Sequence, residues 1–242
     1  MGMKTTIATF ILLLCAVTIH AQPPNTDSIG YRDAIAAAKD LYLQYMGKEA
    51  PIFNGPVSRP FNYTLSEGSQ YFIPIQNPAG KVVYNGLMYT DVPLLFDVLN
   101  NKLITRKPSD NQAFEIQTSH VSHFELDKHR FTYLQTSLAK NMPAGFYEIL
   151  YEGKKNSVYE MHTKLLNEEL GEKFKKYVIE DNSIFYIKKG GAYYKVEKKK
   201  NLYQIYNNHE AEIKSFIKNN QLNVSKNTAA ALIEIAGYFE TL

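Results

Sequence analysis

Short segments rich in Tyr, Phe, Val and Ile follow one another from Tyr63 to about Tyr206, and residues 147–151 and 184–187 are examples. Aromatic and β-branched residues favour strands, particularly in short segments bounded by turn residues. The connections between these segments are brief, whereas a parallel return needs a crossover of about a dozen residues or more. The pattern therefore predicts an antiparallel meander of roughly nine to eleven strands, closed into a barrel-like sheet or a half-barrel.

Turn signals mark the expected strand ends. Asn85-Gly86 suits the two φ > 0 positions of a type I′ turn, and Asn100-Asn101 is a less favourable version of it. A helical turn is expected around residues 166–174, where "NEELGEKF" interrupts the strand pattern. The other predicted turns lie at Asn77-Pro78-Ala79-Gly80, Asp127-Lys128, Glu152-Gly153-Lys154, Asp181-Asn182, Gly190-Gly191 and Lys200-Asn201.

The helical pattern is confined to the two ends of the chain. A helix is expected over residues 30–45, capped by Asp27-Ser28 and closed by Gly47. Its apolar stripe comprises Ile35, Ala38, Leu41, Tyr42 and Tyr45. Residues 50–60 contain Pro51, Gly55, Pro56 and Pro60, so we expect an irregular loop over the surface.

Two helices are predicted after the strands. The first covers "HEAEIKSFIKNN" and is capped by Asn207 or Asn208. The second covers "KNTAAALIEIAGYFETL" and is capped by Ser225. Their inward positions are Ile213, Phe216 and Ile217, and then Leu232, Ile235, Ala236 and Phe239.

The chain thus divides into a signal segment (1–21), a helix with a Pro/Gly loop (22–62), an antiparallel β domain (63–206) and a C-terminal helical pair (207–242). The predicted fold class is α+β and mainly β. No solenoid or propeller repeat is present in the sequence.

The first residues have the pattern of a secretory signal. Lys4 precedes an apolar run over residues 7–19, and Ala21 offers a small residue for cleavage. We expect a protein exported to the periplasm or the outer-membrane periphery, or released outside the cell, with no transmembrane span after cleavage. Cys15 is the single cysteine and stands in a poor lipobox. The mature chain would then have no cysteine for disulfides or thiolate chemistry.

The net charge does not indicate a particular class of binding partner. The chain has 27 Lys and Arg against 24 Asp and Glu, a formal charge of +3, with no long basic arm. Nucleic-acid binding is therefore not expected. The sequence also contains no Gly-x-Ser-x-Gly elbow, phosphate loop or dinucleotide fingerprint, and no cofactor is predicted.

Histidines come closest to a metal-site pattern. His120, His123 and His129 lie near Glu125 and Asp127, but zinc needs three or four ligands that converge. Neighbouring strand residues alternate between faces, which separates His120 from His123. We therefore predict half-exposed polar strand positions here and no metal.

Four residues are the candidates for ligand binding. Asp97 interrupts the apolar run "LLFDVL", and Asp91 flanks the same run. A carboxylate among apolar neighbours must be hydrogen-bonded, ion-paired or protonated, and such groups are more often structural than catalytic. Tyr84 and Tyr89 lie near predicted turns and could grip a sugar or peptide, although cross-strand packing is their commoner role. The chain has 18 Tyr, 13 Phe and no Trp.

Residues 52–72 ("IFNGPVSRPFNYTLSEGSQYF") and 82–105 ("VVYNGLMYTDVPLLFDVLNNKLIT") resemble a group of uncharacterised exported proteins of Bacteroidota. The group combines an aromatic-Asn-Gly element, a Gly-x-x-aromatic segment, a Tyr-Asn/Asp-Gly block ending in Asp, and a closing helical pair. The resemblance implies an envelope location and no particular activity. Val57-Ser58-Arg59 stands where the group has a tyrosine. The matching residues are Asn54, Gly55, Gly68, Phe72, Tyr84, Gly86, Tyr89, Val92, Leu94, Leu95, Phe96 and Asp97.

The sequence favours a non-enzymatic cell-envelope protein that binds a peptide, glycan, lipid or outer-membrane partner. One alternative is a periplasmic hydrolase that uses Asp91 and Asp97 with a histidine. Such an enzyme requires these groups within hydrogen-bond reach of another titratable group in a cleft. A second alternative is a lipid-carrying half-barrel, with a dry apolar cavity and the helices as its lid.

Overall fold

The computed structural model describes residues 28–47, 50–59, 64–74, 78–135, 142–170 and 175–242. Contacts divide the chain into two compact units, residues 1–45 and 46–242, and each is considered by itself. Helix α2 (Ser28–Met46) forms the described part of the first unit, except for its last residue, and confirms the predicted N-terminal helix. The predicted cap residue Asp27 lies outside the described residues.

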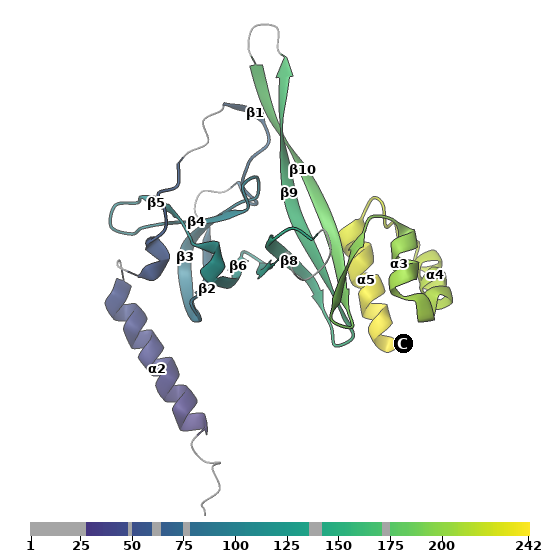
Figure 1. The fold of residues 1–242 in the computed structure, drawn as a ribbon, viewed down its shortest axis with the longest axis horizontal. Helices are drawn as coiled ribbons and strands as arrows, with labels where there is room; N and C mark the ends of the chain where they lie inside the picture. Colours follow the sequence, from purple (N-terminus) through teal and green to yellow (C-terminus); the bar gives the residue numbers. More distant parts are fainter. Residues whose placement is uncertain (1–27, 48–49, 60–63, 75–77, 136–141, 171–174) are drawn as a thin grey trace, which may run out of the picture. The chain divides into compact units, whose positions relative to one another are not determined.

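The second unit is built on one large sheet (Figure 1). Its strands run in the order β5-β4-β3-β2-β6-β7-β8-β9-β10, and β1 and β11 both pair with β10. This confirms an α+β, mainly β fold. The strands are β1 (Leu65–Glu67), β2 (Ala79–Tyr84), β3 (Leu87–Asp97), β4 (Lys102–Arg106), β5 (Ala113–Glu115), β6 (Val121–Leu126), β7 (His129–Leu134), β8 (Gly145–Glu152), β9 (Asn156–Leu170), β10 (Lys175–Lys189) and β11 (Ala192–Val196).

The sheet departs from the predicted simple meander in two ways. Strand β6 pairs with β2, so β2 and not β5 is its neighbour, and β1 pairs with β10 in parallel. The sheet is open: among the described residues, no strand pair joins β5 to the β1 and β11 end. Short turns account for the antiparallel hairpins, whereas these two pairings join residues far apart in sequence.

The glycine-containing hairpin turns are confirmed. Asn85 and Gly86 have φ of 52° and 74°, and Gly190 and Gly191 have φ of 58° and 81°, as a type I′ turn requires. The second predicted turn in this region is different. Asp97 pairs with Lys102, so the loop has four residues, and its Asn101 has φ of 53°.

Four predicted features are wrong in the described part. Ala79 and Gly80 of the turn predicted at Asn77-Pro78-Ala79-Gly80 belong to β2, while Asn77 lies outside the described residues. Asp181-Asn182 lies within β10, opposite Lys164 and Thr163, and is not a turn. Lys200-Asn201 lies within helix α3 (Lys199–Ile205). Residues 166–170 continue β9 and form no helical turn, while 171–174 lie outside the described residues. Continuous pairing along the β9–β10 hairpin overrides the local signals at 181–182 and 166–170.

The loop predicted over residues 50–60 is anchored in the core. It contains a short 3-10 helix, η2 (Pro51–Phe53), whose Ile52 and Phe53 are buried. Gly55 then lies against β5, where an added Cβ would be 1.7 Å from the carbonyl oxygen of Glu115. Only glycine permits this approach, which explains the Phe53-Asn54-Gly55 element.

Helices α3, α4 (Glu210–Asn219) and α5 (Thr228–Thr241) pack against one face of the sheet, which we call the helix face. The two predicted C-terminal helices and their inward residues are confirmed, and α3 is additional. A short 3-10 helix, η5 (Asn207–His209), precedes α4, and α5 begins after Asn227 without the predicted Ser225 cap. The packed core includes Val158 and Ile187 from the sheet and Leu202, Ile213, Leu232 and Ile235 from the helices.

A buried polar contact ties α5 and α3 to the sheet. Tyr206 donates its hydroxyl to Asn156 Oδ1 at 2.7 Å, and Asn156 Nδ2 donates to the Ala236 carbonyl at 3.1 Å. Among the described helices, none combines the length and the apolar character that a membrane crossing requires.

The helix face continues into an aromatic cluster. Phe124 pairs with Phe131, and the rings of Phe96 and Phe146 meet that pair at centroid distances of 5.0 to 5.4 Å. All four side chains are essentially inaccessible to solvent. The register places Glu148 opposite Phe131 and Glu160 opposite Glu148, so both glutamates lie on the helix face too.

Candidate functional site

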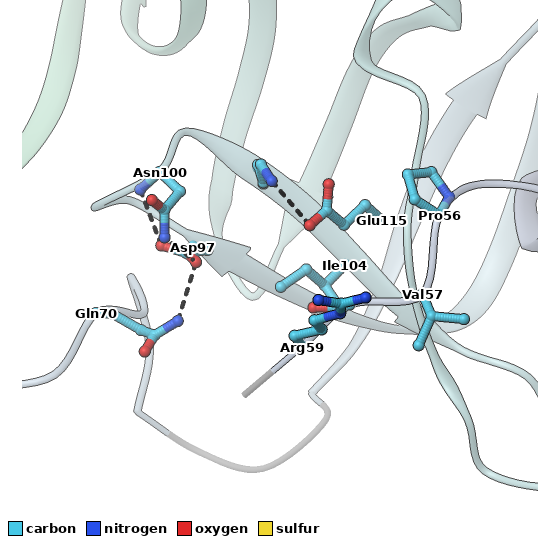
Figure 2. A pocket seen from close by; sticks show the side chains of 10 residues that line it. Pro56, Val57, Arg59, Gln70, Asp97, Asn100, Ile104 and Glu115 are labelled. Carbon is cyan, nitrogen blue, oxygen red and sulfur yellow. Dashed lines mark hydrogen bonds and ion pairs between the residues drawn. The ribbon is translucent and has the colours of Figure 1, made fainter. Parts of the chain in front are cut away.

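An open pocket of about 660 Å³ lies on the face of β3, β4 and β5 that is opposite Phe96 (Figure 2). The strand register places Asp97 beside Lys102 and Ile104 beside Glu115, so these four side chains share one face. Segment 56–59 closes the other side of the pocket. The polar lining residues are Ser58, Arg59, Gln70, Asp97, Asn100, Lys102 and Glu115.

Asp97 is a buried acceptor at the floor of this pocket, with 3% of its surface exposed. Its Oδ1 accepts from the Asn100 backbone N–H at 3.0 Å. Its Oδ2 accepts from Asn100 Nδ2 and from Gln70 Nε2, each at 2.9 Å (Figure 2). These three hydrogen bonds satisfy a carboxylate that would otherwise be costly to bury. The two bonds from Asn100 also close the four-residue loop after β3.

The wall formed by segment 56–59 pairs with the outer edge of β5. Ser58 N–H donates to the Ala113 carbonyl at 2.9 Å, and Glu115 N–H donates to the Pro56 carbonyl at 2.8 Å. This pairing covers a sheet edge that would otherwise be exposed. It also holds Arg59 beside Ile104 at the pocket (Figure 2).

Charges of both signs line the pocket. Lys102 Nζ lies 2.8 Å from Glu115 Oε1, with 46% and 24% of the two side chains exposed. Arg59 adds a second cation and Asp97 a second anion. The pocket therefore offers hydrogen-bond donors and acceptors of both charges to a polar ligand.

The other predicted site residues lie outside this lining. Tyr84 and Tyr89 are buried at 4% and 7% exposure, and Tyr84 packs on His120. Burial raises the pKa of Tyr84. Asp91 is exposed and has φ of 55°, at a bulge where the pairing of β2 with β3 shifts. Aspartate tolerates this left-handed conformation better than most residues, so Asp91 has a backbone role.

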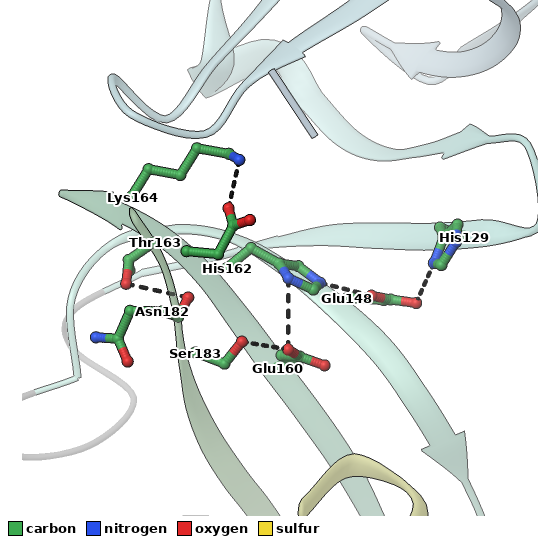
Figure 3. A network of polar contacts seen from close by, with 9 residues as sticks. His129, Glu148, Glu160, His162, Thr163, Lys164, Asn182 and Ser183 are labelled. Carbon is green, nitrogen blue, oxygen red and sulfur yellow. Dashed lines mark hydrogen bonds and ion pairs between the residues drawn. The ribbon is translucent and has the colours of Figure 1, made fainter. Parts of the chain in front are cut away.

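A second polar group lies on the helix face of the sheet (Figure 3). Glu148 accepts from two histidines: its Oε1 lies 2.6 Å from His129 Nδ1 and its Oε2 lies 2.6 Å from His162 Nε2. His162 Nδ1 lies 3.4 Å from Glu160 Oε1. Ser183 Oγ donates to the same Glu160 oxygen at 2.5 Å. We call Glu148, Glu160 and His162, with His129 and Ser183, the His–Glu cluster.

The cluster is covered by aromatic rings. Phe72 meets the His129 and His162 rings at 4.8 Å each and Phe131 at 5.1 Å. Both glutamate side chains are 10% exposed. Burial opposes ionisation of Glu148, but the hydrogen bonds and charges of the two histidines outweigh it and lower its pKa.

The predicted histidine group is separated by the fold. His120 contacts Asn85 at 2.7 Å, and His123 contacts Ser122 at 3.1 Å. His129 instead joins Glu148 and His162, which the sequence reading did not single out. The polar residues of "VYEMHTK" alternate with apolar ones and indicate one polar strand face. The register that brings Glu148 to them is not visible in the sequence.

The geometry thus gives a polar pocket and a His–Glu cluster on opposite faces of the sheet. Glu148, Glu160 and His162 each offer a ligand atom, and these atoms lie within 4.8 Å of one another. Comparisons with protein-family models, curated proteins and solved structures give no significant match to this chain.

Proposed function

We propose that the protein is an exported, non-enzymatic binding module of the cell envelope, and that its pocket holds a polar peptide segment of a partner protein. Export rests on the N-terminal sequence pattern. The proposed binding role is supported by one observation, the open pocket lined by Arg59, Lys102, Asp97 and Glu115. Convergent polar groups in a concave site are the usual basis of ligand recognition.

The lining favours a peptide over a glycan or a lipid. Among the described residues that line the pocket, none is aromatic, whereas sugar binding commonly relies on stacking against aromatic rings. Apolar lining is limited to Pro56, Val57 and Ile104, which is little for an acyl chain. Charges of both signs suit a peptide with acidic and basic side chains, because each can pair across the interface.

The hydrolase alternative gains no support from the pocket. Asp97 Oδ1 accepts from the Asn100 backbone and Oδ2 accepts from the side chains of Asn100 and Gln70, and these amide groups do not titrate. Asp91 is outside the lining. The lipid-carrier alternative requires a cavity beneath the helices, but Leu232 and Ile235 of α5 are fully buried against the sheet face they cover.

Peptide selection tests the proposal directly. A phage-displayed random peptide library is selected on the wild-type protein, and the affinities of enriched peptides are measured by isothermal titration calorimetry. The test variant is Lys102→Ala with Glu115→Ala, which removes the pocket's ion pair without changing net charge. The matched control is Lys81→Ala with Glu125→Ala. This exposed ion pair lies outside the pocket, and its Lys81 Nζ and Glu125 Oε2 atoms are 3.1 Å apart.

We expect the pocket variant to bind enriched peptides at least about tenfold more weakly, because both partners of its charged contacts are lost. The control variant should bind like the wild type. Exposed ion pairs contribute only about 0–1 kcal/mol to stability, so both variants should remain folded. Failure to enrich any peptide, or equal loss in both variants, would refute the peptide assignment. Glycan-array binding that depends on Lys102 would refute it as well.

A further inference from the structure

We propose that Glu148, Glu160 and His162 bind one divalent transition-metal ion, with Zn²⁺ as the probe. The site lies on the helix face, away from the peptide pocket, and does not depend on the proposed peptide binding. Two carboxylates and one imidazole form a ligand set that Zn²⁺ accepts.

The spacing of the ligand atoms supports this assignment. Atoms bound to a tetrahedral zinc at about 2.0–2.2 Å lie roughly 3.3–3.6 Å apart. His162 Nδ1 and Glu160 Oε1 are separated by 3.4 Å, which is long for a hydrogen bond but fits two ligands of one ion. The three ligand atoms already lie within 4.8 Å of one another. Glu148 Oε2 lies at the other ring nitrogen of His162, Nε2, so binding by all three residues requires the Glu148 side chain or the His162 ring to turn toward the ion, with water completing the coordination.

Each of the two glutamate carboxylates also forms a hydrogen bond with an outer partner, a residue that would not itself contact the metal. His129 Nδ1 holds the Glu148 oxygen that does not face His162, at 2.6 Å. Ser183 Oγ donates to Glu160 at 2.5 Å. Metal sites commonly hold their ligands through such outer hydrogen bonds, which fix the orientation of the ligand groups. Figure 3 shows His129 next to Glu148 at one end of the cluster and Ser183 next to Glu160 at the other.

Charge gives an independent reason. The two glutamates place two carboxylates close together in surroundings that leave only a tenth of each side chain exposed. Buried carboxylates require compensating hydrogen bonds or positive charge; His129 and His162 supply these to Glu148, and a cation would add positive charge beside Glu160 as well. A divalent cation supplies two positive charges at one point between them. The nearby Lys164 is already paired with Asp181. The 20% exposure of the His162 side chain and the 40% exposure of His129 leave an entry for the ion.

The test uses protein that carries no polyhistidine tag and has been stripped with EDTA. Zn²⁺ is titrated into it by isothermal titration calorimetry. We expect one ion per chain in the wild type. Glu160→Gln and His162→Gln should each abolish this binding. His129→Gln should weaken it by about 10–100-fold, as loss of an outer partner does. The matched control is His123→Gln, because His123 is a half-exposed strand histidine outside the cluster.

A second measurement needs no variant. In the wild type, Zn²⁺ should shift the imidazole resonances of His162 in a side-chain nitrogen–proton NMR spectrum and leave those of His123 in place. The proposal is overturned if His162 does not respond, or if a folded His162→Gln protein binds Zn²⁺ as the wild type does. Either result would mean that the cluster is an ion-pair network only.

Discussion

Replacing Asp97 with asparagine tests whether the carboxylate at the pocket floor stabilises the fold. Asp97→Asn keeps the shape of the side chain and removes its charge. The asparagine oxygen can still accept from the Asn100 backbone N–H. The new amide group would face two donors, Gln70 Nε2 and Asn100 Nδ2, which now lie 2.9 Å from Asp97 Oδ2.

The magnitude follows from these contacts. Each hydrogen bond to a charged acceptor contributes about 1.5–3 kcal/mol, and a buried donor left without a partner costs about 1–3 kcal/mol. The two neighbouring amides can turn over and recover part of this loss. We therefore expect Asp97→Asn to lower the free energy of unfolding by about 2–4 kcal/mol, or Tm by roughly 4–16 °C for a unit of this size.

Urea unfolding, followed by circular dichroism and tyrosine fluorescence, measures the change. The matched control is Asp91→Asn, which makes the same chemical change on the same strand. Asp91 is exposed at the bulge, and asparagine tolerates its φ of 55° equally well, so the change should stay within about 0.5 kcal/mol. Equal unfolding free energies for the two variants would refute the structural role of Asp97.

Three further predictions concern stability, each measured by urea unfolding. Glu148 has a lowered pKa, so its ionised form stabilises the fold above the ordinary value of 4.5. That contribution disappears as pH falls through the lowered pKa, so Glu148→Gln should destabilise at pH 7 and have little effect in strong acid. An equal effect at both pH values would contradict this. Gly55→Ala should cost more than about 2 kcal/mol, because its Cβ would lie 1.7 Å from a β5 carbonyl oxygen. Gly237→Ala, in the interior of α5, should instead stabilise by about 0.5–1 kcal/mol, because its Cβ would make only an ordinary contact with Tyr151 Cε2, at 3.9 Å. Tyr206→Phe removes the buried hydrogen bond to Asn156 and should cost about 1–3 kcal/mol, and an unchanged midpoint would show that this contact is dispensable.

Local chemistry predicted those parts of the fold that depend on neighbouring residues. Asn85-Gly86 and Gly190-Gly191 form the expected turns because glycine and asparagine accept positive φ. The helices at 209–220 and 226–242 follow from apolar spacing. By contrast, Asp181-Asn182 forms no turn, because fifteen consecutive pairs along β9 and β10 hold it in an extended strand.

The candidate sites depend on contacts that local patterns do not encode. Asp97 was identifiable as a carboxylate in an apolar run, and its structural environment matches the expected hydrogen-bonded aspartate. The pairing of segment 56–59 with β5, which forms the pocket wall, joins residues far apart in the chain. The His–Glu cluster likewise requires the registers of four strands to be known together. A shift of one residue in any of them would move a side chain to the other face.

Site-specific photo-crosslinking in cells tests the peptide pocket most directly. A photoreactive amino acid at position 58, on the pocket wall, is compared with one at position 128, in the exposed β6–β7 turn. We predict a crosslinked polypeptide partner from position 58 that disappears when Lys102 and Glu115 are both changed to alanine. An adduct that forms equally from both positions, or one that persists without the Lys102–Glu115 pair, would contradict it.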